Sequence, residues 1–529
     1  MKIQKNEIIE VIVESYAFEG KGVGFIKDIP TAKTLVEAAT AKTTIDGQQS
    51  AGNPTVEAPT GETPTLSPAT HNPGLNNGLN APEATTDRGF VVFVQGAYPG
   101  EKVRAKVKKV KKNYAESVLT EVLIPSPHRI KPECRHFGVC GGCKQQDLVY
   151  PEQVAHKQAQ VADIFKKIGG IENFPQEPLA ASDKQYYYRN KMEFSFSQKR
   201  WLTQEEAGNR DVTNLGLFLG LHVPGVYDKV LDLQECKLQS PLSEEIMIFT
   251  REYFIEKGMD AYSTKTHTGY LRNLVIRQSE NTDDLMVNLV TSRDEQAVAY
   301  NYASVLTQKF PEVTTVVNNI NTSKAQVAKG EYEIVVLGSG KIYDKIGDYK
   351  FGISANSFFQ TNTLQAEKLY YIALEYAGLR GNEVVFDLYC GAGTITIFMA
   401  SHCREIYGFE AVPDAIMDAE TNKNLNNAPN AHFFMADLYK SFLPVVAERK
   451  LQKPDVVVLD PPRSGLHPNT LSDVISLSPA KIVYVSCNPA TQARDVKEFL
   501  ETGYRLVKSR AVDMFPNTWH IENVVLLVK

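Results

Sequence analysis

From Val384 to the end of the chain, short apolar runs alternate with longer stretches that have helical spacing. Strands that alternate with helices in this way build a doubly wound, mainly parallel sheet. In such a sheet, ligands and chemistry lie outside the carboxyl ends of the strands. The polar residues that directly follow each apolar run are therefore the first candidates for a functional site.

The first of these runs is followed by a glycine turn at Gly391 and Gly393. A glycine turn after a buried strand is typical of a nucleoside cofactor site, because glycine lets the ligand approach the backbone. Thr396 stands where a dinucleotide site would have a third glycine. Glu410 ends the next strand, where a carboxylate can bind a ribose diol, and Asp437 follows the third strand, where it can meet an adenine edge. The pattern fits S-adenosylmethionine, which has no pyrophosphate.

A cysteine follows a later apolar run, in the sequence Ser-Cys-Asn-Pro. A free cysteine is most often a small buried core residue, but Cys487 has polar company at neighbouring strand ends. Asp460 begins the sequence Asp-Pro-Pro-Arg, in which the prolines stiffen a loop. Glu522 lies at the start of the last strand. Cys487 and Glu522 are thus a candidate nucleophile and a candidate base.

Four of the seven cysteines lie before this region. Cys134, Cys140 and Cys143 share one short stretch with intervening glycines, which predicts a loop that wraps a metal ion or cluster. The fourth ligand must come from elsewhere, and Cys236 is the first candidate, with His136 in reserve. The spacing alone does not separate zinc from an iron–sulfur cluster.

The N-terminal part predicts a small β-barrel, because short apolar runs between Ile8 and Ile124 are separated by Gly and Pro turns. Residues 28–88 interrupt these runs and contain no Phe, Tyr or Trp, so we expect a disordered insertion. One expected strand and its turn are strongly basic, which favours phosphate contacts over a merely solvated face. The cations are Lys102, Arg104, Lys106, Lys108, Lys109, Lys111 and Lys112.

Composition sets wider limits. The chain has 529 residues, enough for about three or four domains. The net charge of −5 means that nucleic-acid binding needs a local basic patch; aromatic and basic residues around Arg189 and Lys191 offer another candidate surface. No apolar run approaches the roughly 18 residues of a membrane span, and the first residues show no signal segment. We therefore expect a cytoplasmic protein that does not contact a membrane.

The motifs resemble those of the S-adenosylmethionine-dependent RNA uracil-5-methyltransferases. The N-terminal barrel resembles the TRAM domain, an RNA-binding module of that family. The four cysteines resemble the branch that holds a 4Fe-4S cluster and acts on 23S ribosomal RNA. The resemblance covers nearly everything except the insertion. The matching stretches are 387–393 (Asp-Leu-Tyr-Cys-Gly-Ala-Gly), 460–463 (Asp-Pro-Pro-Arg), 486–491 (Ser-Cys-Asn-Pro-Ala-Thr) and 520–522 (His-Ile-Glu).

The resemblance implies an α/β chain with a TRAM-like, OB-like barrel at 1–125, a central α+β domain at 126–350 and a Rossmann-like methyltransferase domain at 351–529. It implies a 23S rRNA (uracil-C5)-methyltransferase with S-adenosyl-L-methionine and a 4Fe-4S cluster as cofactors. The implied cluster ligands are Cys134, Cys140, Cys143 and Cys236.

In this family's reaction, a thiolate adds to uracil C6 and so activates C5 towards the methyl group. The resemblance implies Cys487 as that nucleophile and Glu522 as the base that removes the C5 proton. Phe358 or Phe359 can stack on a uracil taken out of its helix. The residues implied around the cofactor are Gln360, Tyr389, Thr394, Glu410, Asp437 and Asp460. Of these, Tyr389 and Thr394 stand where relatives often have Phe and Asn.

Two alternatives stay open. An amino-methyltransferase that acts on RNA bases also uses an Asp-Pro-Pro loop, but it needs neither Cys487 nor Glu522. A non-catalytic RNA-binding ribosome assembly factor would keep a degenerate methyltransferase fold. We expect RNA as the partner, no obligate protein partner and a monomer. The sequence does not name the uridine that is modified.

Overall fold

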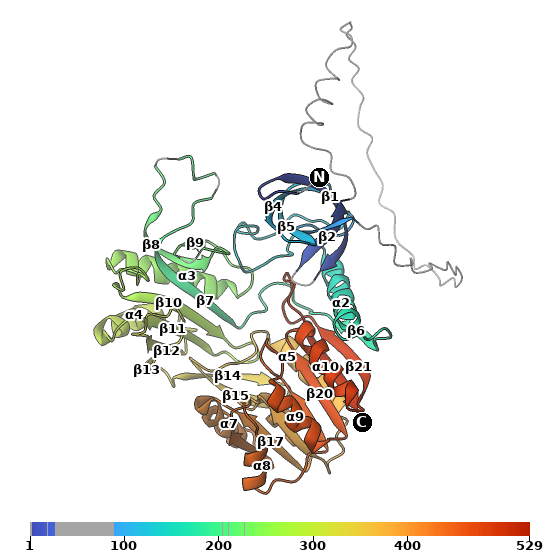
Figure 1. Ribbon diagram of the computed structural model, residues 1–529. Coiled ribbons are helices and arrows are strands. Elements are labelled where there is room, and N and C mark those ends of the chain that lie inside the picture. The colour runs from blue at the N-terminus through green and yellow to red at the C-terminus, as the bar shows by residue number, and fades with distance from the viewer. Residues whose placement is uncertain (1–2, 18–19, 27–88, 204, 210, 227) are drawn as a thin grey trace, which may run out of the picture. The chain divides into compact units, whose positions relative to one another are not determined.

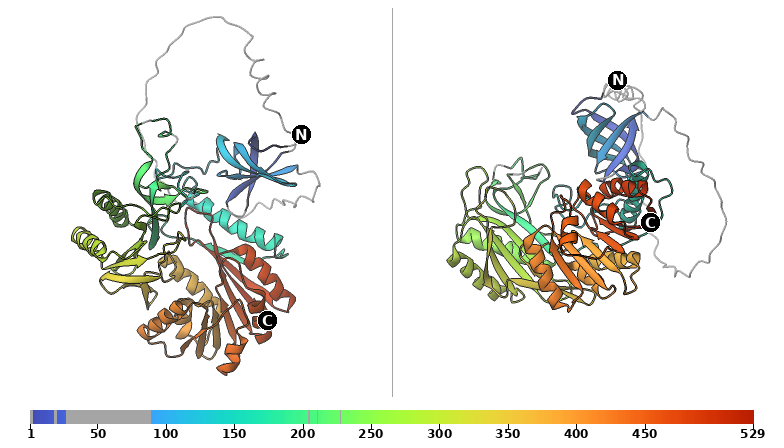
Figure 2. Two further views of the ribbon diagram at one scale, coloured as in Figure 1. Left: turned by 60° about the vertical axis from the view of Figure 1, so that its left-hand side comes forward. Right: turned by 60° about the horizontal axis from the view of Figure 1, so that its bottom comes forward.

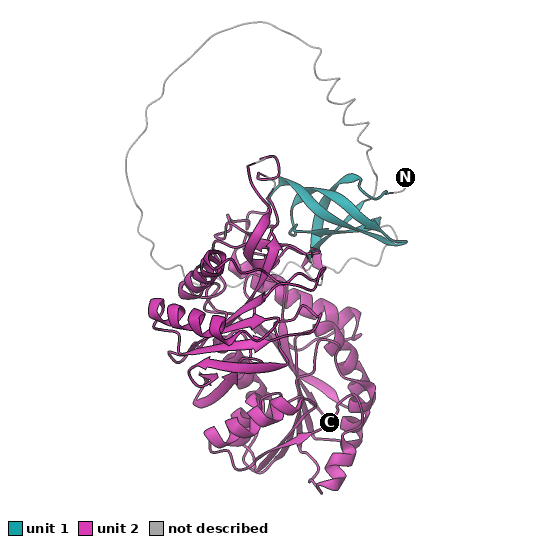
Figure 3. Ribbon diagram, turned by 90° about the vertical axis from the view of Figure 1, so that its left-hand side faces the viewer, with its two compact units in different colours: residues 1–15, 21–125 teal, residues 16–20, 126–529 magenta. Residues whose placement is uncertain are grey.

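The computed structural model describes residues 3–17, 20–26, 89–203, 205–209, 211–226 and 228–529. The insertion expected at 28–88 lies outside the described residues. The chain forms two compact units, one of residues 1–15 and 21–125 and the other of residues 16–20 and 126–529 (Figure 3).

The first unit is a closed five-stranded barrel with the strand order β1-β2-β3-β5-β4. Val103, Ala105 and Val107 are buried inside it, and the basic residues alternate with them. Arg104 forms ion pairs with Glu10 at 3.2 Å and Glu121 at 2.7 Å, so its charge is already matched within the barrel. The strands are β1 (Ile8–Ala17), β2 (Lys21–Ile26), β3 (Phe90–Gln95), β4 (Lys102–Val110) and β5 (Tyr114–Ile124).

The second unit contains a seven-stranded mixed sheet (Figure 1) with the order β13-β12-β11-β10-β7-β8-β9. The helices α3 (Pro241–Glu256) and α4 (Gln296–Lys309) bury Phe254, Tyr302 and Leu306 in its core. The strands are β7 (Lys191–Lys199), β8 (Leu215–His222), β9 (Val230–Asp232), β10 (Leu271–Gln278), β11 (Leu285–Thr291), β12 (Thr315–Ile320) and β13 (Tyr332–Leu337).

The same unit contains an eight-stranded sheet with the order β18-β17-β16-β19-β20-β22-β21-β6. Figure 2 shows the orange and red strands of this sheet beside helices of the same colours. The strands from β18 to β20 are parallel, and β22 runs antiparallel to both β20 and β21. The strands are β6 (Gln176–Ala180), β16 (Val384–Leu388), β17 (Glu405–Glu410), β18 (Ala431–Met435), β19 (Val456–Leu459), β20 (Lys481–Ser486), β21 (Arg505–Val512) and β22 (Glu522–Val528).

Helices cover both faces of this sheet, as a doubly wound fold requires. One face packs against α5 (Thr363–Ala377), α6 (Thr394–Ala400) and α7 (Pro413–Leu425). The other packs against α2 (Tyr150–Lys167), α8 (Leu443–Glu448), α9 (Pro468–Leu477) and α10 (Pro489–Glu501). A hairpin of β14 (Lys341–Ile346) and β15 (Tyr349–Ser354) precedes α5. The α/β class and the N-terminal barrel expected from the sequence are confirmed.

The eight-stranded sheet also uses chain from the region expected to form the central domain. Strand β6 pairs in parallel with β21, and α2 packs against α10. A buried ion pair holds α2 in place: Lys157 donates to Asp513 at 2.6 Å, and both side chains are inaccessible to solvent. Tyr150 donates a further hydrogen bond to Asp513 at 2.9 Å. Since these contacts join residues more than 300 positions apart, no local pattern could reveal them.

No helix in the described part of the chain combines the length and the apolar character needed to cross a bilayer.

The buried ion pair gives a prediction about stability. Lys157→Met should leave the carboxylate of Asp513 buried without its cation and lower the free energy of unfolding by about 3–5 kcal/mol. Urea denaturation of the full chain measures this value. The matched control is Lys167→Met in the same helix, which removes an ion pair with Asp163 whose partners are 72% and 53% exposed. This control should cost about 0.5 kcal/mol or less; equal losses in the two variants would contradict the account.

Candidate functional site

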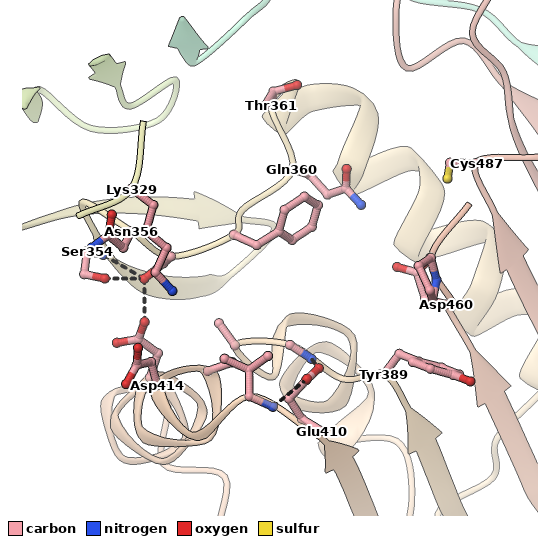
Figure 4. A pocket seen from close by; sticks show the side chains of 18 of the residues that line it. Lys329, Ser354, Asn356, Gln360, Thr361, Tyr389, Glu410, Asp414, Asp460 and Cys487 are labelled. Atoms are coloured by element: carbon pink, nitrogen blue, oxygen red, sulfur yellow. Dashed lines mark hydrogen bonds between the residues drawn. The ribbon is translucent and has the colours of Figure 1, made fainter. Parts of the chain in front are cut away.

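A cavity of about 1310 Å³ opens at the carboxyl ends of the parallel strands. Its lining includes Tyr389 and Gly391 after β16, Glu410 at the end of β17, Asp460 after β19 and Cys487 after β20. Figure 4 shows Gln360, Asp460 and Cys487 around one part of the cavity and Glu410 in another. Four separate segments of the sheet therefore deliver functional groups to a single space.

The glycine turn after β16 has the geometry that a close ligand needs. Gly391 has φ of 54° and Gly393 has φ of 77°, a region that favours glycine. A Cβ on Gly393 would lie 2.6 Å from the ring of Phe433, whereas a Cβ on Gly391 would meet no atom within 4 Å. Gly393 is thus required by packing against the sheet, and Gly391 faces open space in the cavity.

Glu410 is held in a fixed orientation beside this turn. Its Oε2 accepts a hydrogen bond from the Gly391 amide at 3.1 Å. Its Oε1 accepts from the amides of Ala411 at 2.7 Å and Val412 at 2.9 Å (Figure 4). A carboxylate oxygen has more lone pairs than these bonds use, so Glu410 can still accept hydrogen bonds from a ligand's hydroxyl groups.

Thr396 fills the place of a dinucleotide site's third glycine for a structural reason. Its hydroxyl donates to the carboxylate of Asp387 at 2.6 Å, beneath the glycine turn. Asp387 is fully buried, and burial raises its pKa to about 7, an effect that the bond from Thr396 partly opposes. The pair therefore supports the turn from below and does not line the cavity.

Cys487 and Glu522 lie at neighbouring strand ends, as the sequence predicted. Cys487 is on the turn between β20 and α10, and Glu522 is the first residue of β22. The antiparallel register pairs Ser486 with Asn523, the residues directly adjacent to them. Both side chains line the cavity, together with Asp460.

Burial dominates the protonation of these three groups. It raises the pKa of Glu522 well above its usual value and that of Asp460 to about 7. Burial, together with the carboxylates of Glu522 and Asp460, also raises the pKa of the Cys487 thiol to about 11. Arg463 acts in the opposite direction, because its guanidinium hydrogen-bonds to Cys487 and favours the thiolate. The ligand-free site thus favours the protonated nucleophile and base.

Arg463 connects the Asp-Pro-Pro-Arg loop to the cysteine turn. The side chain of Asn488 donates to the Arg463 carbonyl at 2.9 Å, and Thr491 donates to the same oxygen at 3.3 Å. The guanidinium lies 3.0 Å from Nδ1 of His520. Burial, followed by the charge of Arg463, lowers the pKa of His520 to about 4, so this histidine is neutral at physiological pH.

The loop between β15 and α5 distinguishes the two phenylalanines that the sequence left as alternatives. Phe359 is only 4% exposed and packs in the core, whereas Phe358 is 70% exposed and lines the cavity. The side chain of Asn190 donates to the carbonyl of Gln360 at 2.8 Å and so fixes the loop to the start of β7. Phe358 is therefore the aromatic surface that is available to a base.

Three of the residues expected around the cofactor point elsewhere. Thr394 and Asp437 are not among the cavity's lining residues. The Thr394 hydroxyl bonds with Tyr370 at 2.9 Å, and Asp437 accepts from the Tyr439 amide at 3.0 Å and pairs with Lys440. The backbone of Tyr389 lies at the turn, with φ of 67°, but its hydroxyl hydrogen-bonds with Thr470.

Several lining residues carried no recognisable signal in the sequence. Lys329, Lys341 and Asp414 reach the cavity from the loop before β13, from β14 and from the start of α7. Asn356 lies two residues before Phe358 and also lines the cavity, but the sequence predicted no role for it. Long-range contacts between hairpin and sheet place these side chains, so one-dimensional patterns could not reveal them.

The four cysteines of the N-terminal half surround one small hollow, which His136 also lines. Burial, together with the neighbouring cysteines, raises the pKa of Cys143 to about 12 and that of Cys236 to about 11. The Gly142 amide donates to the sulfur of Cys140 at 3.4 Å. Nε2 of His136 already accepts from the Gln234 amide at 3.1 Å. Within the described ranges, no three His, Cys, Asp or Glu side chains are arranged to hold one metal ion.

Sequence comparison identifies two regions of the chain. Residues 278–529 match the family described as tRNA (Uracil-5-)-methyltransferase, and residues 83–120 match the TRAM domain. An uncharacterized RNA methyltransferase of Chlorobaculum tepidum is 44% identical over 442 residues, which cover 83% of this chain and 92% of that protein. Another, from Porphyromonas gingivalis, is 42% identical over 447 residues, which cover 83% of this chain and 96% of the relative.

Structural comparison agrees with this grouping. The crystal structure of the Pyrococcus abyssi tRNA (uracil-54, C5)-methyltransferase in complex with S-adenosyl-L-homocysteine is similar to this chain, with a TM-score of 0.64 and 30% sequence identity. The similarity covers 84% of this chain and 98% of that one. The family resemblance predicted from the motifs is confirmed, and the chain belongs to the S-adenosylmethionine-dependent RNA (uracil-5-)-methyltransferases, with a TRAM domain in its N-terminal region.

Proposed function

We propose that the protein methylates C5 of a specific uridine in 23S ribosomal RNA through a covalent bond between Cys487 and the uracil ring. The observation that carries this proposal is the meeting of Cys487, Glu522 and Asp460 in one cavity with the glycine turn at Gly391. The barrel at 1–125 binds RNA, the region 126–350 holds the cysteines, and 351–529 performs the transfer. The enzyme acts as a monomer and needs no obligate protein partner.

The cavity fits the methyl donor on the evidence of its own groups. Gly391 leaves space for a ligand to approach the backbone, and Glu410 presents a fixed carboxylate of the kind that binds a ribose diol. Bound S-adenosylmethionine supplies an electrophilic methyl group. The residues that we assign to its site are Gln360, Glu410, Asp460 and the backbone of Tyr389. Thr394 and Asp437, which the resemblance also implied, do not line the cavity and are left out of this assignment.

Cys487 performs the first step. Its thiol loses a proton, and the thiolate adds to C6 of the uracil, which breaks the C5–C6 double bond and moves electron density to C5 as an enolate. Arg463 assists because its guanidinium favours the thiolate over the thiol. C5 then forms a bond to the methyl group while the bond between that methyl group and the sulfonium sulfur breaks, which leaves S-adenosylhomocysteine, and the ring is held as a saturated adduct on the cysteine sulfur.

Glu522 completes the reaction. Its carboxylate takes the proton from C5, the electron pair re-forms the C5–C6 double bond, and the bond between C6 and the Cys487 sulfur breaks. Burial raises the pKa of Glu522, which makes its carboxylate a stronger base than an exposed one. The product is a 5-methyluridine. The proton that Glu522 took from C5 passes to the Cys487 thiolate, so both side chains return to their starting forms, and the proton that Cys487 lost at the start is the one released to solvent.

Mapping the positions of 5-methyluridine in cellular RNA decides whether the substrate is ribosomal RNA or tRNA. Loss of the gene should remove 5-methyluridine from one position of 23S rRNA, and restoring the wild-type gene should return it. Loss of a tRNA 5-methyluridine with unchanged rRNA would assign the enzyme to tRNA, the substrate in the name of the matching family and of the Pyrococcus protein.

We further propose that Cys134, Cys140, Cys143 and Cys236 hold a 4Fe-4S cluster. The four side chains share one hollow, and a cluster of several irons spreads its four cysteine ligands wider than a single ion does. His136 is the weaker candidate, because its Nε2 is occupied by the Gln234 amide. The methylation chemistry moves no electron, so the role of the cluster is to hold this loop in position.

Substitution of Cys487 and Glu522 tests the mechanism. Cys487→Ala removes the adduct that activates C5, and methyl transfer should fall on the order of 10³-fold or more. Glu522→Gln allows addition and methylation but leaves the C5 proton, so a methylated protein–RNA adduct should accumulate. That adduct should survive denaturing electrophoresis and carry the label of the donor methyl group.

The matched controls lie away from the cavity. Cys403→Ala changes a buried cysteine after α6. Glu405→Gln changes a carboxylate at the start of β17 that hydrogen-bonds with His432. Both should turn over at the wild-type rate. Normal turnover by Cys487→Ala or by Glu522→Gln would remove the proposed roles and favour an amino-methyltransferase.

Alkylation of Cys487 tests the electrostatics of the ligand-free site. The rate of reaction with iodoacetamide should rise with pH and should still be rising at about pH 10, because the pKa of the buried Cys487 thiol is raised to about 11. Arg463→Gln removes a cation that favours the thiolate and should shift the profile to higher pH. Glu522→Gln removes a carboxylate that opposes the thiolate and should shift it to lower pH, each by on the order of one pH unit or less. Mass spectrometry of the Cys487 peptide measures the rate, with the Cys403 peptide as reference. Shifts in the same direction would contradict the assignment.

Metal analysis tests the cluster. Protein purified without oxygen should be brown and contain iron and sulfide at about four atoms each per chain. Cys236→Ser should lose most of the visible absorbance, whereas Cys403→Ser, a buried cysteine outside the hollow, should retain it. Stoichiometric zinc without iron would replace the cluster with a zinc site.

A further inference from the structure

A second pocket of about 480 Å³ adjoins the cavity on the side of the seven-stranded sheet. Lys191 of β7 and Arg277 of β10 lie opposite each other across the paired strands, and both line this pocket. The proposed reaction uses neither of these cations. The residues that line both hollows are Gly141, Gly142, Arg189, Ser357, Phe358 and Thr361.

Arg277 is an unusual residue for the interior of a protein. It is only 3% exposed, and its Nη2 donates to the carbonyl of Ser357. Its Nε is buried and has no hydrogen-bond partner. In the part of the chain that the structure describes, no carboxylate forms an ion pair with it. Lys191, by contrast, is paired with Glu193.

Arg189 has a similar deficit. Its Nε is also buried without a hydrogen-bond partner, although the rest of the residue is partly exposed. Two guanidinium groups with unused donors therefore line one pocket. A buried cation is costly unless an anion compensates its lost hydration. Burial lowers the pKa of Arg277 to about 10, and the charges of Glu193 and Glu333 offset this only in part.

We propose that this pocket binds a phosphodiester group of the RNA strand, next to the uridine that enters the cavity, with Arg277 and Arg189 as donors. The inference rests on the proposed function and adds to it where the RNA strand lies on the protein. A planar guanidinium matches the oxygens of a phosphate, and phosphate contacts fix the register of a nucleic acid. Phe358 stands exposed at the boundary of the two hollows, where it can separate the extruded base from its backbone.

Neutral backbone linkages test this site. The probe is a fluorescent heptaribonucleotide with one central uridine and adenosines elsewhere, in which single methylphosphonate linkages replace the phosphates one at a time. With the wild-type protein, one linkage beside the uridine should weaken binding by about tenfold when it loses its charge. Arg277→Gln should bind the unmodified probe about tenfold more weakly and should be insensitive to that same linkage.

Further variants serve as controls for the loss of charge and for correct folding. Arg277→Lys keeps the charge and should retain part of the linkage effect. Arg404→Gln removes a cation that bonds with Gln452 near the amino end of β17 and should behave as wild type. If the melting temperature shows that Arg277→Gln is unfolded, Arg189→Gln decides the matter, because Arg189 is partly exposed and less involved in packing.

Two results would overturn the proposal of a phosphate site. If every methylphosphonate linkage weakens binding to the arginine variants as much as it weakens binding to the wild type, the pocket does not bind phosphate. If Arg277→Gln instead weakens binding of S-adenosylhomocysteine, the pocket serves the carboxylate of the methyl donor. Methylation of the same probe is measured separately by mass spectrometry. If the arginine variants lose the linkage effect but the probe is not methylated, the phosphate site stands and the proposed reaction does not. If the probe is methylated but the variants keep the linkage effect, the proposed reaction stands and the phosphate site does not.

Discussion

Strand β22 runs antiparallel to β20, so its first residue lies beside the last residues of its neighbour. In a wholly parallel sheet, the first residue of this strand would lie at the opposite edge, far from the cavity. The reversal brings Glu522 to the edge where Cys487, Asp460 and Glu410 already lie. A shift of one residue in the pairing would turn Glu522 to the other face of the sheet. The register between two strands thus decides whether a nucleophile and a carboxylate share one space.

The same proximity shapes the electrostatics of the cavity. Cys487, Asp460 and Glu522 are all weak acids, and burial favours the neutral form of each. Both carboxylates add to this effect at Cys487, and Asp460 adds to it at Glu522, whereas Arg463 opposes it at Cys487 and at Glu522. A cationic ligand in the cavity would favour the charged forms of all three, since opposite charges at close range stabilise each other. A site built from several acids is therefore complementary to a sulfonium, and occupation by that ligand would favour the thiolate of Cys487 and the carboxylate of Glu522, which are the forms that the proposed reaction uses.

The sequence predicts the parts of this site that follow from the periodicity of the sheet. Gly391, Glu410, Asp460 and Cys487 each follow an apolar run, and parallel strands necessarily gather such residues at one edge. Prediction is weaker where the local turn decides the direction of a side chain. Asp437 also follows a strand, but it binds the Tyr439 amide and Lys440 and does not line the cavity.

Other features depend on distant partners and leave no local signal. Arg277 lies in the apolar run of β10, where it resembles a chance polar residue in a core strand, and only the folded structure shows that it lines a pocket and that, among the described residues, its Nε has no hydrogen-bond partner. Phe358 and Phe359 are adjacent, and the packing of Phe359 against Phe351 decides which of them remains exposed. The pairing of β6 with β21 likewise joins segments that are far apart in the sequence.

The segment between β15 and α5 connects the two sheets of the second unit at the cavity. Ser357 accepts from Arg277 of the seven-stranded sheet, and the Gln360 carbonyl accepts from Asn190 at 2.8 Å. At its other end Asn362 caps α5 and donates to the Met514 carbonyl at 3.0 Å, beside the eight-stranded sheet. This short segment therefore connects the pocket that Arg277 lines with the cavity that Cys487 and Glu522 line. Since a displacement of about 1 Å can slow a bimolecular reaction on the order of a hundredfold, the position that this connection sets for the cavity wall matters to the proposed reaction beyond the groups that take part in it.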